Sequence, residues 1–143
     1  MHRFHRLFTA AALCAASLPA LAQDDAMTGQ LLELQQQWAH INYQVPKDDR
    51  SAAFTNLEGQ AKTLAEQYPQ RAEPKVWEAI TLSTHAGVDG GLGALSMVRK
   101  ARDLLLEAEK IEPTTLQGSV YTSLGSLYYQ VPGWPLPVLR QLN

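Results

Sequence analysis

Apolar side chains recur every three or four residues along most of the chain, the spacing that places them on one face of an α-helix. The run between Thr28 and Gln44 is the clearest. Its apolar residues follow one another in steps of 3, 4, 3 and 4, and they are Leu31, Leu34, Trp38, Ile41 and Val45. No stretch alternates apolar and polar residues for long enough to predict a β-strand. The pattern therefore predicts an all-α protein.

Prolines and glycines divide this pattern into separate helices. We expect five of them, at residues 28–44, 51–68, 73–86, 93–111 and 116–130. The glycine-rich stretch from Gly87 to Gly93 predicts a flexible hairpin loop between the third and fourth helices. A phosphate-binding loop is the alternative, but such a loop follows a strand and carries Lys-Ser or Lys-Thr after its glycines. This stretch follows a helix and precedes Ala94, which favours the hairpin.

The helices also repeat one another. The second and fourth share a row of apolar and small residues that ends on proline, and Pro69 and Pro113 are 44 residues apart. The third and fifth carry aromatic residues, Trp77 and Tyr121, that are also 44 residues apart. Chance helical periodicity would not reproduce both offsets, so we infer an internal repeat of two helices.

The residues that carry this repeat resemble the tetratricopeptide repeat. They are Tyr121, Leu124, Gly125 and Tyr128 on a first helix, and Ala101, Leu105, Ala108 and Pro113 on a second. The resemblance implies an α-α superhelix of antiparallel helix pairs with a concave binding groove. About two and a half repeats fit, at residues 28–69, 73–113 and, incompletely, 116–131. It also implies core packing for Trp38, Trp77, Tyr121 and Tyr128.

The chain departs from that family in its second repeat and at its end. Trp77 to Pro113 spans 36 residues, about eight more than the corresponding span of the family's repeat. We expect the surplus in the loop from Gly87 to Gly93. The string from Tyr128 to Pro135 is similar to a group of proteobacterial periplasmic proteins, some of them TatT-like accessory subunits of TRAP-type solute transporters. Those relatives continue into another helix pair, whereas this sequence ends at Asn143. We therefore expect a C-terminally truncated relative.

The missing helix would leave the last helix uncovered. The residues expected to lack a packing partner are Val120, Leu124, Leu127 and Tyr128. Stability in repeat proteins comes from contacts between neighbours. We therefore expect marginal stability, self-association or dependence on another chain.

The first residues have the three parts of a secretory signal peptide. A basic start is followed by the apolar run Leu7 to Leu18, and Ala20-Leu21-Ala22 then supplies the small residues of a cleavage site. We expect residues 1–22 to be removed on export to the periplasm, leaving residues 23–143 as one helical domain without a membrane span. Its formal net charge is −4, because Arg3 and Arg6 are the charged residues lost, and this argues against nucleic-acid binding.

Few residues of the expected mature chain suggest chemistry. His40 and His85 are its histidines, and we expect both on the surface or lining a groove. The acidic pairs Asp24-Asp25 and Asp48-Asp49 are expected in a tail and a loop, where carboxylates are solvated rather than catalytic. The lone cysteine, Cys14, lies in the signal segment. We therefore assign no catalytic, cofactor-binding or metal-binding residue and expect no enzyme activity.

Two further groups of residues are candidates for surface contacts. Arg99, Lys100 and Arg102 form a basic cluster that we expect on a solvated face, with Asp103 pairing with Arg99. Three aromatic residues fall outside the repeat register, and we expect them to be exposed contacts for a partner. They are Tyr43, Tyr129 and Trp134.

These patterns favour a periplasmic scaffold or adaptor that binds a protein or peptide in its groove. One alternative is a transporter accessory that binds a small ligand or a TRAP substrate-binding protein. Another is a truncated relative without a function of its own. A peptide groove should be lined by polar side chains, whereas a small-ligand site should be an enclosed apolar pocket.

Overall fold

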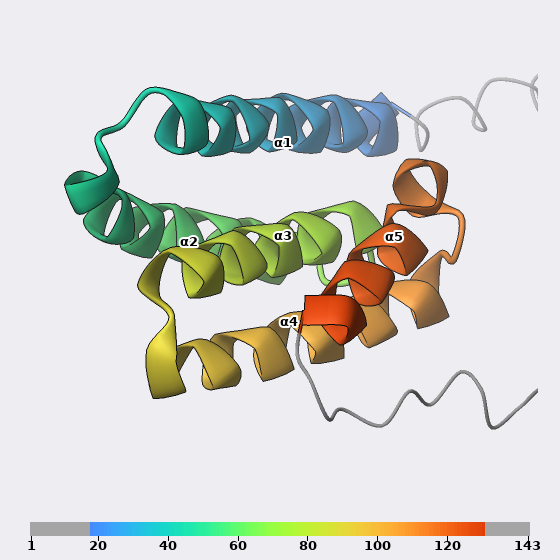
Figure 1. Ribbon diagram of the computed structural model, residues 1–143. Coiled ribbons are helices and arrows are strands. Elements are labelled where there is room, and N and C mark those ends of the chain that lie inside the picture. Colours follow the sequence, from blue (N-terminus) through green and yellow to red (C-terminus); the bar gives the residue numbers. More distant parts are fainter. Residues whose placement is uncertain (1–17, 131–143) are drawn as a thin grey trace, which may run out of the picture.

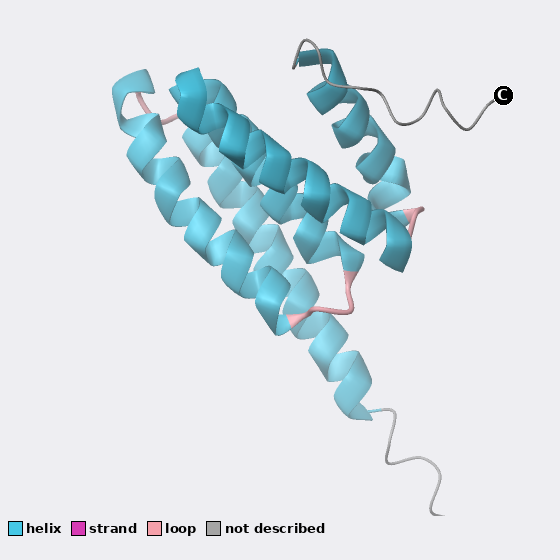
Figure 2. Cartoon of the chain, turned by 90° about the horizontal axis from the view of Figure 1, so that it is seen from below, coloured by secondary structure: helices cyan, strands magenta, loops and turns pink. Residues whose placement is uncertain are grey.

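The computed structural model describes residues 18–130, and this part of the chain is built from α-helices joined by short connections. The elements are α1 (Leu18–Tyr43), the short 3-10 helix η1 (Lys47–Asp49), α2 (Arg50–Gln67), α3 (Ala72–Asp89), α4 (Gly91–Ile111) and α5 (Thr115–Gln130). The described residues contain helices and loops and no strand (Figure 2). The predicted all-α class is confirmed.

Each helix packs on the helix that follows it in the chain. Figure 1 shows α1 above α2 and α3, with α4 below them and α5 crossing at one end. The first helices of successive pairs also touch, because α3 contacts both α1 and α5. α3 is therefore the central helix, and the arrangement of adjacent packed helices is that expected of a helical repeat fold.

The buried side chains form two clusters that follow the two predicted repeats. The first lies between α1 and α2 and is built from Leu31, Leu34, Ile41, Phe54, Leu57, Ala61 and Leu64. The second joins α3, α4 and α5, where Ala101 and Ala108 are fully buried and allow the helix backbones to approach closely. Trp77 of α3 packs on the first cluster and so connects the two.

The glycine-rich stretch is not the long loop that we expected. α3 continues to Asp89 and α4 starts at Gly91, so Gly90 alone separates the two helices. Gly90 and Gly91 have φ angles of 64° and 68°, which explains why glycine stands at this turn. The surplus residues of the second repeat lengthen its two helices, and α3 and α4 form the most extensive helix pair in the described chain.

The last helix is also covered more fully than we expected. Val120, Leu124 and Leu127 are buried against α3 and α4, so the prediction that they lack a partner is wrong. α5 begins with residues of left-handed backbone at positions 116–118, and regular helix follows from there. Tyr121, which we assigned to the core, is 53% exposed instead. Tyr128 is half-buried and packs beside the second cluster.

The first helix begins earlier than we expected, at Leu18 rather than near Thr28. Asp24 therefore lies on α1 and not in a tail, and it forms an ion pair with Arg71. Arg71 also donates a hydrogen bond of 2.8 Å to Glu73 of α3. One guanidinium thus joins the start of α1 to the start of α3. Among the described residues, no helix combines the length and the apolar character needed to cross a membrane.

Candidate functional site

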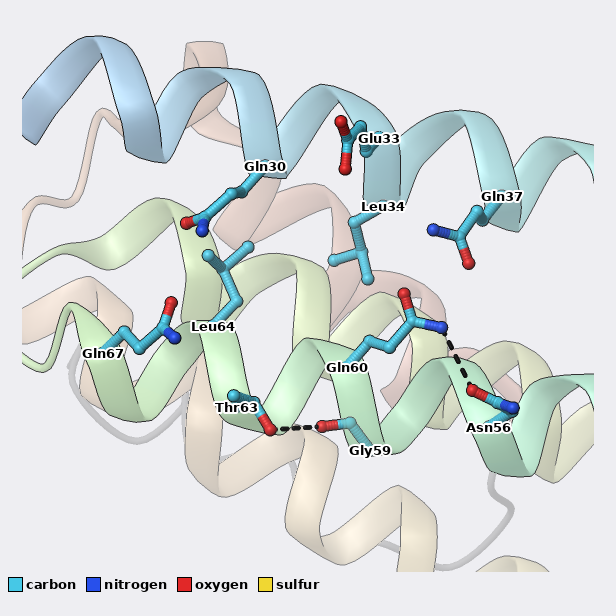
Figure 3. A pocket seen from close by; sticks show the side chains of 10 residues that line it. All are labelled: Gln30, Glu33, Leu34, Gln37, Asn56, Gly59, Gln60, Thr63, Leu64 and Gln67. Atoms are coloured by element: carbon cyan, nitrogen blue, oxygen red, sulfur yellow. Dashed lines mark hydrogen bonds between the residues drawn. The ribbon is translucent and has the colours of Figure 1, made fainter.

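A groove with a volume of about 540 Å³ lies between α1 and α2. Its walls present polar and apolar surface in about equal amounts, and half of its lining residues carry a side-chain carboxamide. We call it the carboxamide groove and define it by Gln30, Glu33, Leu34, Gln37, Asn56, Gly59, Gln60, Thr63, Leu64 and Gln67. In Figure 3, side chains of both helices point toward the space between them, namely Gln30, Leu34 and Gln37 of α1 and Gln60 and Leu64 of α2.

Helical spacing places these side chains side by side. Gln30 and Gln37 are seven residues apart on α1, and Gln60 and Gln67 are seven apart on α2, so each pair lies along one face two turns apart. Leu34 and Leu64 are buried and form the floor where the two helices meet. The carboxamides lie on either side of this floor, since their positions on each helix are next to the apolar residues that form the helix contact.

Most of the groove's carboxamides have hydrogen-bonding capacity to spare. Gln60 donates one hydrogen bond of 3.1 Å to the Asn56 oxygen, and Thr63 donates one of 2.9 Å to the Gly59 carbonyl (Figure 3). A carboxamide offers two N–H donors and an acceptor oxygen, so these bonds use only part of its capacity. The groove can therefore donate to and accept from the same ligand.

Gly59 leaves open space in the α2 wall. A Cβ placed on Gly59 would meet no atom within 4 Å outside its own helix turn. A ligand can therefore approach the α2 backbone closely at this point, and a side chain introduced there would project into the groove without disturbing the core.

A second hollow of about 360 Å³, with a more apolar surface, continues the groove along α1. It shares Glu33 and Gln37 with the carboxamide groove and adds Gln36, His40 and Ile41. His40 is exposed, as expected, and its Nδ1 lies 3.1 Å from the Gln44 oxygen. The two hollows together follow α1 for about three turns, a shape suited to an elongated ligand.

The sequence-predicted contact residues do not lie in this groove. Tyr43 and Tyr129 are 76% and 90% exposed, at the ends of α1 and α5, two helices that do not touch within the described chain. Tyr43 packs edge-on to Trp38, with ring centroids 6.3 Å apart. Trp134 lies outside the described residues. Partner contact at these aromatic residues stays a prediction.

His85 is not the surface residue that we expected. It is 3% exposed and stacks on Phe54 of α2, with ring centroids 6.0 Å apart. Its Nδ1 lies 2.7 Å from Glu58 Oε1, and its Nε2 lies 3.2 Å from Asp89 Oδ2 without hydrogen-bond alignment. Both ring nitrogens thus face carboxylates, which gives this histidine a structural contact between α2 and α3.

The basic cluster is not simply a solvated face. Lys100 lies 2.8 Å from Glu78, a carboxylate of α3 that is 4% exposed. Asp103 pairs with Arg102, its neighbour, at 2.7 Å and not with Arg99 as predicted. Lys100 therefore compensates a buried charge in the contact between α3 and α4.

Sequence reasoning did not find the carboxamide groove. Its signal in α1 was the pair Gln30 and Gln37, two turns apart on one face with Glu33 between them, but glutamine carries no catalytic chemistry and so drew no attention. Within the described residues no three His, Cys, Asp or Glu side chains cluster as metal ligands would. Comparison of the chain with family models, curated proteins and solved structures found no match.

Proposed function

We propose that this protein is a non-enzymatic periplasmic scaffold or adaptor of the tetratricopeptide-like class, which holds an extended segment of another polypeptide in the carboxamide groove. The observation that supports the proposal most strongly is the composition of the groove. Five of its lining residues are glutamine or asparagine, namely Gln30, Gln37, Asn56, Gln60 and Gln67. The export signal predicted in residues 1–22 supports the periplasmic location.

A polypeptide backbone is the ligand whose chemistry matches these side chains. An extended segment presents alternating N–H donors and C=O acceptors, and a carboxamide can pair with either. Recognition through the main chain gives affinity with little dependence on sequence, while pockets for side chains add specificity. Leu34 and Leu64 on the floor offer such an apolar contact in the middle of the groove.

The charged residues that line the groove further restrict which peptide segments it can bind. Glu33 is the one charged residue in its lining, and no lysine or arginine lines it. A phosphorylated or acidic segment would find no cation there, whereas a basic side chain would find the Glu33 carboxylate. We therefore expect neutral or weakly basic segments to bind better than acidic ones.

The alternative of a small-ligand transport accessory calls for an enclosed apolar pocket. The groove between α1 and α2 is open and half of its lining residues carry a carboxamide, which favours the polypeptide. A ligand that lies along the open carboxamide groove also does not require the protein to close around it.

Peptide binding to the purified chain tests this proposal. Unstructured peptides that are neutral, basic or acidic would be compared by fluorescence anisotropy, together with versions whose backbone nitrogens are methylated. We expect micromolar binding of the neutral and basic peptides and its loss on methylation, because methylation removes the main-chain donors. Binding that follows side-chain hydrophobicity and ignores methylation would contradict the proposal.

A glycine substitution locates the binding site. Gly59→Met fills the groove from the α2 side, and we expect it to weaken peptide binding at least tenfold while the helical fold is kept. Gly87→Met is the matched control, because Gly87 is also helical and open but lies on α3 outside the groove. Equal binding by the two variants would place the peptide elsewhere.

A further inference from the structure

α5 has one face that no other described helix covers. α3 packs between α2 and α4, whereas α5 packs only on α3 and α4. The exposed residues recur at the spacing of one helical face, and we call them the α5 outer face: Tyr121, Thr122, Gly125, Ser126 and Tyr129. The face thus lies opposite the buried row of Val120, Leu124 and Leu127.

The α5 outer face combines large exposed aromatics with a small centre. Tyr121 is 53% exposed and Tyr129 is 90% exposed, and such rings are enriched where proteins bind one another. Gly125 lies four residues from each tyrosine, and a Cβ built on it meets nothing within 4 Å. A second helix could therefore approach closely at Gly125, with one tyrosine on either side of the crossing.

We propose that two copies of this protein associate through the α5 outer face, with the two α5 helices antiparallel and crossing at Gly125. The pattern Tyr-Gly-Tyr is symmetric about Gly125, so a two-fold axis there brings Tyr121 of each copy beside Tyr129 of the other. This inference goes beyond the proposed function and does not depend on it.

The absence of charged residues from α5 favours a second copy of this protein as the partner that binds the α5 outer face. α5 contains no aspartate, glutamate, lysine or arginine, although charged residues are frequent on the exposed faces of α2 and α4. Two identical charged faces would repel each other across a two-fold axis, whereas two neutral ones do not. The Tyr121 hydroxyl interacts with the Glu109 carboxylate of α4, and the hydroxyl groups of Thr122, Ser126 and Tyr129 can pair across the axis, so the polar atoms of the face need not stay unsatisfied.

The carboxamide groove stays open in such a dimer. It lies between α1 and α2, and neither helix contacts α5 in the described chain. A dimer built on α5 therefore presents two peptide grooves, and a partner with two segments would bind both with increased avidity.

Sedimentation equilibrium tests the dimer. The protein is expressed from its full sequence, including the N-terminal segment, and is purified with whatever N-terminal processing the cell has carried out. We expect the wild type to dimerise and Gly125→Glu to weaken the dimer at least tenfold, because two carboxylates would meet at the crossing. Gly29→Glu is the control: Gly29 is helical, open and on α1, so this variant should dimerise like the wild type.

Charge reversal tests the proposed geometry. Gly125→Lys alone should be as monomeric as Gly125→Glu, and an equimolar mixture of the two should form dimers again. A wild type that stays monomeric, or a mixture that does not associate, would overturn the proposal. Thermal melting at a protein concentration low enough for the wild type to be monomeric gives a further check, since a Gly125→Glu variant that then unfolds at a markedly lower temperature would show that the chain itself covers this face.

Discussion

At the scale of single residues, two of the polar side chains buried on α3 are held by a neighbouring helix. Glu78 is 4% exposed and faces Lys100 of α4, and His85 is 3% exposed and faces Glu58 of α2. A buried polar group without a partner is costly, so these contacts fix which helices lie on either side of α3. Polar pairs therefore add specificity to a core that is otherwise mostly apolar.

Removing the partner of Glu78 should destabilise the fold. Lys100→Gln leaves a buried carboxylate without its cation, and we expect a loss of about 1–2 kcal/mol in the free energy of unfolding, toward the lower end because Lys100 is half exposed. Urea unfolding followed by circular dichroism measures it. Arg99→Gln is the control, and equal effects of the two substitutions would mean that the Lys100 contact carries no stability.

Glu73 should make stability depend on pH. Burial acts to raise its pKa, but hydrogen bonds from Arg71 and from the backbone outweigh burial, so the pKa lies below its ordinary value of 4.5. A carboxylate with a lowered pKa in the folded state stabilises the fold above its ordinary pKa, and this contribution is lost as the pH falls through the lowered value.

Comparison with a neutral variant isolates that contribution. We expect Glu73→Gln to be less stable than the wild type near neutral pH and to approach it as the pH falls through the lowered pKa, where the wild-type carboxylate takes up its proton. Urea unfolding at a series of pH values gives the two curves. A gap that stays constant across the series would show that the loss does not come from the charge of Glu73.

At the scale of helices and turns, the sequence located all five helices but misplaced the limits of several. The glycine at Gly87 suggested an end to α3, yet the helix passes through it to Asp89. A glycine inside a helix costs only about 1 kcal/mol, and the packing of the longer α3 on α4 outweighs that cost. Local propensity alone could not show this, because the compensating contacts come from another helix.

Substitution by alanine should change the stability in opposite directions at Gly90, in the turn, and at Gly87, inside α3. Gly90 has φ 64° and ψ −165°, a conformation almost confined to glycine, so Gly90→Ala should cost about 1–3 kcal/mol. Gly87 is helical and open, so Gly87→Ala should gain up to about 1 kcal/mol. Thermal unfolding of both variants checks this, and a stabilising Gly90→Ala would contradict the turn described here.

The register of α5 shows a second limit of sequence reasoning. The repeat pattern predicted Tyr121 in the core, whereas the core takes Val120, Leu124 and Leu127 and leaves Tyr121 exposed. Residues 116–118 have left-handed backbone angles and reset the orientation of the helix that follows them. Gly118 hinted at such a conformation, but positive φ at Leu116 and Gln117 has no sequence signal.

At the scale of the whole molecule, the helices form a stack whose two ends differ in chemistry. The first pair presents the carboxamide groove, and α5 at the other end presents a neutral face with exposed tyrosines. Periodicity predicted the stack, because each helix must bury its apolar face against a neighbour. It could not predict the groove, which depends on how two polar rows from separate helices come together.

The central claim is that the carboxamide groove binds the main chain of an extended segment, and NMR tests it most directly. The side-chain NH₂ signals of glutamine and asparagine would be followed while a neutral, unstructured peptide is added. We predict shifts at Gln30, Gln37, Asn56, Gln60 and Gln67, and none at Gln117 and Gln130 of α5. Signals that stay unchanged in the groove while the peptide binds would contradict the account.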